Sequence, residues 1–261
     1  MFSTLDRLIE VPGGKIFSRT WSSDKKSNSP IILLHDSLGS IDLWGSFPLT
    51  IAETTKRTVV AYDRLGFGRS TARQELPSIR FISEEAEIYF PAIKSELEIK
   101  HFTLFGHSVG GAMAVSIAAH FQNECDAVIT ESAQAFVEDL TIKGIQIAKQ
   151  KFKNPEAVEK LKKLHGEKAQ WVLNAWIDVW LSPEFSSWSL KDTLPKLKCP
   201  LLAIHGDKDD YGSKKFPEMI SGLAGGKSQM QLIADCGHVP HREKKEQVLH
   251  LVNSFLNLKL D

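Results

Sequence analysis

The chain has 261 residues, with 32 Lys plus Arg against 32 Asp plus Glu, and 42% of its residues are hydrophobic. This profile is typical of a soluble globular protein and excludes a disordered or collagen-like chain. A chain of this length buries roughly 70–75% of the surface that its unfolded form exposes, so one core is stable without a metal or disulfide staple. A net charge of zero argues against a protein that coats nucleic acid or an anionic membrane. We therefore expect a small-molecule partner, with no nucleic acid and no membrane.

The cysteines and the N-terminal residues bear on the compartment. Cys125, Cys199 and Cys236 lie far apart in the sequence and include no CxxC pair, so we expect neither a disulfide framework nor a thiolate zinc site. Asp6 and Arg7 stand where a signal peptide needs an apolar stretch, and no uncharged apolar run approaches the ~18 residues of a membrane span. These features predict a cytoplasmic protein.

Taken in chain order, the apolar runs predict two short opening strands and six buried strands. The opening strands, residues 4–11 and 15–21, flank glycines that permit turn conformations. The later runs are residues 31–34, 58–62, 102–105, 127–130, 201–204 and 230–233, and helical patterns lie between them at about 41–54, 82–98, 110–121, 213–224 and 241–257. Short apolar strands that alternate with helices predict an α/β fold, with a mostly parallel central sheet flanked by helices.

One stretch breaks this alternation. From about residue 134 to residue 198 the pattern is helical, with no strand between the fourth and fifth of the buried strands. We interpret residues 134–198 as a helical cap inserted into a core that is formed by residues 1–133 and 199–261. The cap holds four of the six tryptophans: Trp171, Trp176, Trp180 and Trp188.

The sharpest local signal is a G-x-S-x-G pattern, Gly106-His107-Ser108-Val109-Gly110, directly after a predicted strand and before a predicted helix. A serine on such a tight turn is held in a strained backbone conformation with its hydroxyl exposed, and small neighbours avoid a collision. The helix N-terminus also offers N–H groups and a positive dipole end to an oxyanion. Glycine–serine patterns occur by chance in loops, but the flanking strand and helix favour a nucleophilic Ser108.

A serine hydroxyl needs a base to remove its proton, and the base needs an orienting carboxylate. Three carboxylates follow the fifth buried strand, Asp207, Asp209 and Asp210, and His238 follows the sixth. Catalytic groups of parallel sheets gather at these carboxyl ends. The 29 residues from Asp209 to His238 are enough for one helix and one strand.

Two other histidines compete for a role at the site. His107 adjoins the nucleophile, and we expect it to pack or form hydrogen bonds beneath the turn. His241 follows His238 by three residues and is the main rival as base. The HxxH spacing of this pair is a weak metal-site pattern, and we expect no metal and no cofactor.

Five motifs in this order together resemble the α/β-hydrolase fold family: HDSLGS, AYDRLGFGRS, GHSVGG, HGDKDD and CGHVPH. The resemblance spans nearly the whole chain, and the cap falls at the family's usual insertion point. It implies that the acid is the last Asp of a G-x-x-D pattern, Asp209, and that the base is His238 of the G-H pattern. A serine nucleophile disfavours the branches that attack with Asp, haloalkane dehalogenases and epoxide hydrolases, and implies acyl chemistry.

The resemblance also implies an oxyanion hole made by the backbone N–H groups of Ser37 and Val109. In the first loop, Asp36 replaces the glycine of the commoner His-Gly opening. A carboxylate aimed at the oxyanion would be unfavourable, so we expect Asp36 to point away and to cap the helix that begins near Ile41 or Asp42.

Several reactions remain open. A carboxylic-ester hydrolase or lactonase needs only the triad, the hole and an apolar pocket, and the Ser-Leu-Gly of the first loop is similar to that of enol-lactonases. A carbon–carbon bond hydrolase of aromatic ring-cleavage products is the alternative, although such relatives often carry Trp where this chain has Val239. No specific signal favours an amide hydrolase. A non-catalytic ligand receptor of the same fold has no need of an intact triad, and a homo-oligomer is left open.

The cap should decide the substrate, which we expect to be a small ester or lactone. Trp176 and Trp180 share one helix face and either bind an apolar substrate or join the cap to the core. Residues 141–170 hold eight lysines against three glutamates. These lysines form either a solvated outer face or a cationic surface that steers anionic substrates to the cleft.

Overall fold

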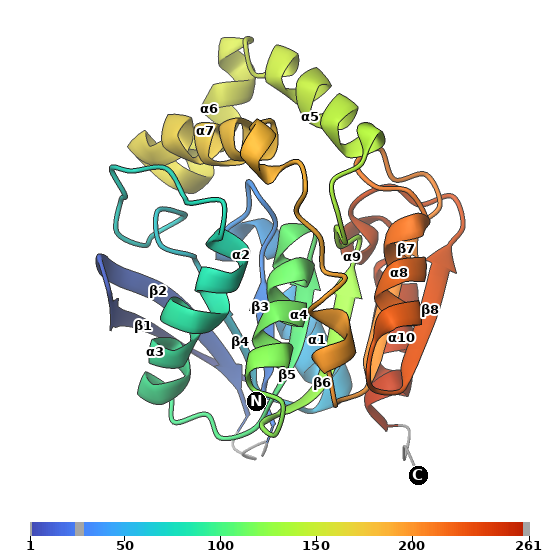
Figure 1. The fold of residues 1–261 in the computed structure, drawn as a ribbon. Helices are drawn as coiled ribbons and strands as arrows, with labels where there is room; N and C mark the ends of the chain where they lie inside the picture. Colours follow the sequence, from blue (N-terminus) through green and yellow to red (C-terminus); the bar gives the residue numbers. More distant parts are fainter. Residues whose placement is uncertain (1, 24–28, 258–261) are drawn as a thin grey trace.

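The computed structural model describes residues 2–23 and 29–257. Within them, eight strands form one sheet in the order β1-β2-β4-β3-β5-β6-β7-β8 (Figure 1). β2 pairs antiparallel with β1 and with β4, and the remaining neighbours pair in parallel. This confirms the predicted α/β class. The strands are β1 (Ser3–Val11), β2 (Gly14–Ser22), β3 (Ile31–Leu34), β4 (Val59–Tyr62), β5 (Phe102–His107), β6 (Cys125–Glu131), β7 (Leu201–Gly206) and β8 (Ser228–Ile233).

Helices cover both faces of the sheet, which is why β3, β4, β5 and β7 are buried along their whole length. Alternate strand residues point to opposite faces. Ile32 therefore belongs to the apolar cluster with helices α3 (Phe90–Glu96) and α4 (Val109–His120). Ile31 and Leu33 belong to the cluster with α1 (Phe47–Thr55) and α10 (Lys245–Asn257).

Three predicted helices are interrupted. The helix expected at 41–54 consists of a 3₁₀ turn, η1 (Ile41–Trp44), and α1, because Gly45 between them has φ 58°. The helix expected at 82–98 begins at Phe81 as α2 (Phe81–Glu84), passes through a π-helical turn, η2 (Glu85–Tyr89), and ends with α3. The helix expected at 241–257 is divided at Lys244 into α9 (Pro240–Glu243) and α10. Hydrophobic periodicity continues across such short breaks and does not reveal them.

The segment 134–198 is helical, as the sequence predicts. Its helices α5, α6 and α7 lie together across the top of the molecule in Figure 1, above the strands and helices of the core. Its limits as a cap domain stay a prediction. The segment consists of α5 (Asp139–Lys151), α6 (Pro155–His165), η3 (Gly166–Lys168), α7 (Ala169–Trp180), η4 (Pro183–Phe185) and η5 (Leu194–Lys196), and α8 (Lys215–Leu223) follows it after β7.

Among the described residues, none of the helices has the length and apolar character needed to cross a membrane.

Candidate active site

Ser108 lies on the sharp turn between β5 and α4. Its φ of 55° and ψ of −126° place it in a region that non-glycine residues rarely occupy. A Cβ atom at Gly106 would lie 2.2 Å from the carbonyl oxygen of Gly110, and one at Gly110 would lie 2.2 Å from the carbonyl oxygen of Leu34. The turn therefore needs glycine at both positions, which is the physical content of the G-x-S-x-G pattern.

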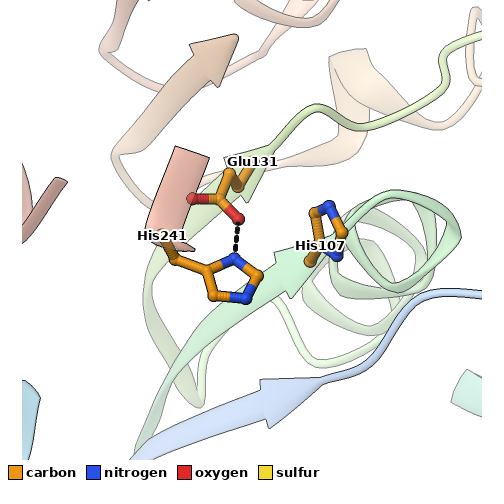
Figure 2. A group of neighbouring side chains, drawn as sticks. All are labelled: His107, Glu131 and His241. Atoms are coloured by element: carbon orange, nitrogen blue, oxygen red, sulfur yellow. Dashed lines mark hydrogen bonds and ion pairs between the residues drawn. The ribbon is translucent and has the colours of Figure 1, made fainter. Parts of the chain in front are cut away.

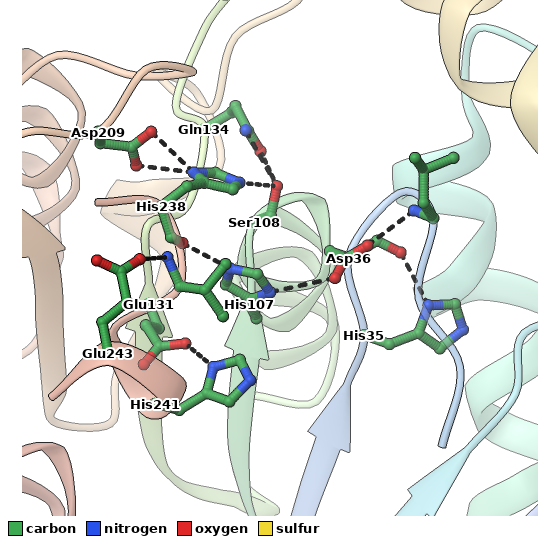
Figure 3. Close-up of polar contacts among 12 residues, drawn as sticks. His35, Asp36, His107, Ser108, Glu131, Gln134, Asp209, His238, His241 and Glu243 are labelled. Carbon is green, nitrogen blue, oxygen red and sulfur yellow. Dashed lines mark hydrogen bonds and ion pairs between the residues drawn. The ribbon is translucent and has the colours of Figure 1, made fainter. Parts of the chain in front are cut away.

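His238 and Asp209 meet Ser108 from two other loops. His238 Nε2 is 3.0 Å from Ser108 Oγ, and His238 Nδ1 is 2.8 Å from each carboxylate oxygen of Asp209 (Figure 3). Burial alone would raise the pKa of Asp209, but the hydrogen bond and charge of His238 outweigh it and hold this pKa below its usual value. A charged Asp209 fixes the proton on Nδ1 and leaves Nε2 to accept the serine proton.

The rival residues lie elsewhere. Asp207 accepts a hydrogen bond from the backbone N–H of Cys236, and Asp210 is exposed. His241 is buried on α9, and its Nδ1 is 2.5 Å from Glu131 Oε2. His241 therefore faces Glu131. His238, the other histidine of the HxxH pattern, is the one that contacts Ser108.

The two predicted oxyanion donors come from two separate segments of the chain, the loop after β3 and the start of α4. Ser37 lies on the loop after β3 and lines the cavity beside Ser108. Val109 is the first residue of α4, so its N–H has no acceptor within the helix. In the described part of the chain, neither N–H has a hydrogen-bond acceptor. Both are therefore free to bind an oxyanion, and that role stays a prediction.

The prediction that Asp36 caps the helix near Ile41 is wrong. The N–H of Ile41 instead donates to Asp63 Oδ1 at 2.6 Å. Asp36 Oδ1 accepts the N–H of Leu38 at 2.7 Å, a turn within its own loop. Its other oxygen lies 3.4 Å from His107 Nδ1, a partner 71 residues away that local sequence cannot indicate.

A mostly apolar cavity of about 150 Å³ opens beside Ser108 and His238. Trp176 and Trp180, both predicted to bind substrate, line it from α7. The Trp176 ring lies 6.0 Å from that of Tyr211, which in turn lies 4.9 Å from the His238 ring. The aromatic wall thus continues to the candidate base, and the contact of these tryptophans with a substrate stays a prediction.

The other two tryptophans of the segment pack within the protein. Trp171 packs edge-on against Phe67 at 5.6 Å, and Trp188 stacks on Phe185 at 5.4 Å. The lysines of residues 141–170 do not line the cavity. Seven of them are exposed, and Lys168 donates to main-chain carbonyls of residues 67, 68 and 70.

Gln134 is a site residue that the sequence did not reveal. It is buried, lines the cavity and places its Nε2 3.1 Å from Ser108 Oγ. When this amide N–H donates to Oγ, the serine O–H remains free to donate to His238. A glutamine belongs to none of the motifs, and its one signal is its position shortly after the carboxyl end of β6.

Comparisons with known proteins agree with this architecture. A family model described as alpha/beta hydrolase fold matches residues 29–157. A proline iminopeptidase of Lactobacillus crispatus (strain ST1) is 21% identical, and the match covers 89% of this chain and 92% of that protein. The crystal structure of a membrane phospholipase A has a TM-score of 0.77 at 21% identity, over 97% of this chain and 86% of that chain. A thermophilic esterase from Thermogutta terrifontis has a TM-score of 0.73 at 19% identity, over 97% of this chain and 98% of that chain.

Proposed function

Because this chain has the α/β-hydrolase fold, we propose that it is a serine hydrolase that cleaves short, uncharged carboxylic esters or lactones through an acyl-enzyme. The observation that carries the proposal is the chain of hydrogen bonds from Ser108 Oγ through His238 to a buried Asp209. A nucleophile, a base and an orienting acid in this geometry are the requirements of acyl transfer.

In the proposed reaction, Ser108 Oγ attacks the acyl carbon while its proton passes to His238 Nε2. Asp209 stabilises the imidazolium, and the N–H groups of Ser37 and Val109 donate to the tetrahedral oxyanion. Loss of one such donor typically costs about 3 kcal/mol. His238 then protonates the leaving alkoxide. A water molecule gives a proton to His238 and attacks the acyl-enzyme, and His238 returns that proton to Ser108 Oγ as the carboxylic acid leaves.

The cavity supports a short and uncharged acyl group. An apolar cavity of about 150 Å³ holds a molecule of the size of benzene. The described residues that line it include no lysine or arginine, and its one carboxylate outside the triad, Asp36, is paired with His107. A charged acyl group would lose its hydration there without gaining a partner.

An amide hydrolase is the second candidate, because the proline iminopeptidase is similar along most of its length. A substrate with a free N-terminal ammonium group needs an unpaired carboxylate near the nucleophile. The pairing of Asp36 with His107 removes the carboxylate that lies beside Ser37. We therefore favour ester hydrolysis and retain amide hydrolysis as one outcome of the test.

The test combines labelling with a substrate screen. We expect a fluorophosphonate probe to modify Ser108, and we expect p-nitrophenyl esters of about two to six acyl carbons to be turned over faster than longer ones. The Ser108→Ala variant should lose a factor of about 10⁴ to 10⁶ in kcat. Faster cleavage of prolyl-p-nitroanilide than of any ester would favour the amide reading. A protein that neither reacts with the probe nor hydrolyses any substrate would be a ligand receptor instead.

A further inference from the structure

The carboxylate of Asp36 raises an electrostatic problem for the proposed reaction. Asp36 directly precedes Ser37, one of the two proposed oxyanion donors, and its side chain is 20% exposed. A negative charge so close to a developing oxyanion would raise the energy of the transition state, and partial burial limits screening by water. The buried Arg64 donates from Nη2 to the main-chain carbonyl oxygen of Asp36 at 2.7 Å. A positive charge that faces the carboxylate itself would offset it.

The polar contacts of His107, one ion pair and one hydrogen bond, indicate that this residue carries that charge. Its Nδ1 faces Asp36 Oδ2 at 3.4 Å, and its Nε2 lies 2.8 Å from the main-chain carbonyl oxygen of His238 (Figure 3). A carboxylate and a carbonyl oxygen are both acceptors only, and a neutral imidazole has one N–H to donate. Only the imidazolium form of His107 presents an N–H group to both oxygens.

We propose that His107 is a charged positioning residue that links the loop carrying Asp36 and Ser37 to the loop carrying the base, His238. One N–H neutralises Asp36 beside the oxyanion loop, and the other holds the main chain of His238, the base. The inference rests on the proposed function, since it concerns how that site is held and balanced.

The groups packed beneath His107 favour its positive charge. Glu131 at the end of β6 is fully buried and hydrogen-bonds His241 on α9 (Figure 2). Ligand atoms of His107, Glu131 and His241 lie within 4.8 Å of one another, a spacing that could also suit a metal ion. Both nitrogens of His107 already face other acceptors, and Glu131 Oε2 is bonded to His241. The buried Glu131 Oε1 has no hydrogen-bond partner among the described residues, so the charge of this carboxylate acts on His107 with little screening.

The charges around His107 give a pH dependence with a definite sign. Burial alone would lower the pKa of His107, but the hydrogen bond to Asp36 and the charge of Glu131 outweigh burial and raise this pKa to about 9. The same ion pair holds the pKa of Asp36 well below its usual value, although burial alone would raise it. The stabilisation by charged His107 is therefore complete below the unfolded-state pKa near 6.5 and is lost as pH rises through about 9.

A double-mutant cycle tests the proposal with a p-nitrophenyl ester as substrate. We expect His107→Gln to lower kcat about 10- to 100-fold with little change in KM, because Asp36 is left unbalanced beside the oxyanion. Adding Asp36→Asn to the His107→Gln variant should raise kcat at least about tenfold. Equal kcat for His107→Gln and the double variant, or a coupling confined to Tm, would overturn the proposal.

The surface pair His101 and Asp126 is the matched control, since it has the same chemistry at 3.1 Å but is exposed and remote from the motifs of the site. His101→Gln, Asp126→Asn and their combination should leave kcat unchanged and show no coupling. A coupling there as large as that of Asp36 with His107 would make the proposed role non-specific and so contradict it.

The pH dependence of kcat tests the proposal even if the His107 variants do not fold. Wild-type kcat should fall as pH rises through about 9, and Asp36→Asn should abolish this fall, because the variant has no carboxylate that a neutral His107 leaves unbalanced; an unchanged profile in the variant would contradict the proposal. If the wild type hydrolyses no substrate, the proposed function fails. The ¹⁵N shifts of the His107 ring at pH 7.5 then decide the inference alone: two protonated nitrogens are expected, and a neutral ring would overturn it.

Discussion

The loops at the carboxyl edge of the sheet and the helical segment 134–198 line the same cavity, but different forces position their side chains. The loop residues are fixed by short polar contacts, such as those of His238 with Ser108 and Asp209. The segment presents Trp176 and Trp180, which are positioned by ring packing. Hydrogen bonds are directional and packing is not. We infer that the loops set the chemistry, whereas the segment sets the size of substrate.

The largest expected effect is a loss of stability on substitution of Trp180. It is 2% exposed and packs edge-on against Phe185 at 5.0 Å and Trp188 at 5.8 Å. Trp180→Ala should lower the free energy of unfolding by about 3–5 kcal/mol, measured by urea denaturation. Trp176→Ala, at the half-buried neighbour on the same helix face, should cost much less stability and extend the acyl chain length accepted. Equal losses of stability would show that both tryptophans serve packing alone.

Gln134 sharpens the comparison, because it is the first residue of the segment and yet contacts the nucleophile. Gln134→Ala removes one hydrogen bond to Ser108, so kcat/KM should fall about tenfold while Tm stays nearly constant. In Gln134→Glu the carboxylate can only accept and competes for the serine proton, so a larger loss is expected. A fully active Gln134→Ala variant would show that Gln134 has no part in the reaction and that the loop residues alone carry it.

The smallest effect concerns the lysines of the segment. Seven of the eight in residues 141–170 are exposed and none lines the cavity, so they can act only on the encounter with substrate. If they steer anionic esters, kcat/KM for an ester with a carboxylate should fall about two- to threefold between about 0.05 and 0.5 M NaCl. The value for a neutral ester should not change. Identical salt responses would leave these lysines as a solvated outer face.

Sequence patterns predicted the strands and the order of the candidate triad because they depend on near neighbours in the chain. The glycines at positions 106 and 110 mark the turn at Ser108, since any side chain there would collide with the backbone. The spacing from Asp209 to His238 corresponds to the interval between the ends of β7 and β8, which are paired neighbours in the sheet. Helix limits were less exact, because one-residue breaks such as that at Lys244 leave the apolar face intact.

By itself, then, the sequence determined the α/β class, the turn that carries Ser108 and the strand ends that carry Asp209 and His238. Only the tertiary structure decided the partners of the buried polar groups. It paired Asp36 with His107, turned His241 toward Glu131 and placed Gln134 against the nucleophile. The physical reason is that periodicity and turn strain are local properties of the chain. The hydrogen bonds of a buried side chain, by contrast, depend on which distant strands and helices the fold brings beside it.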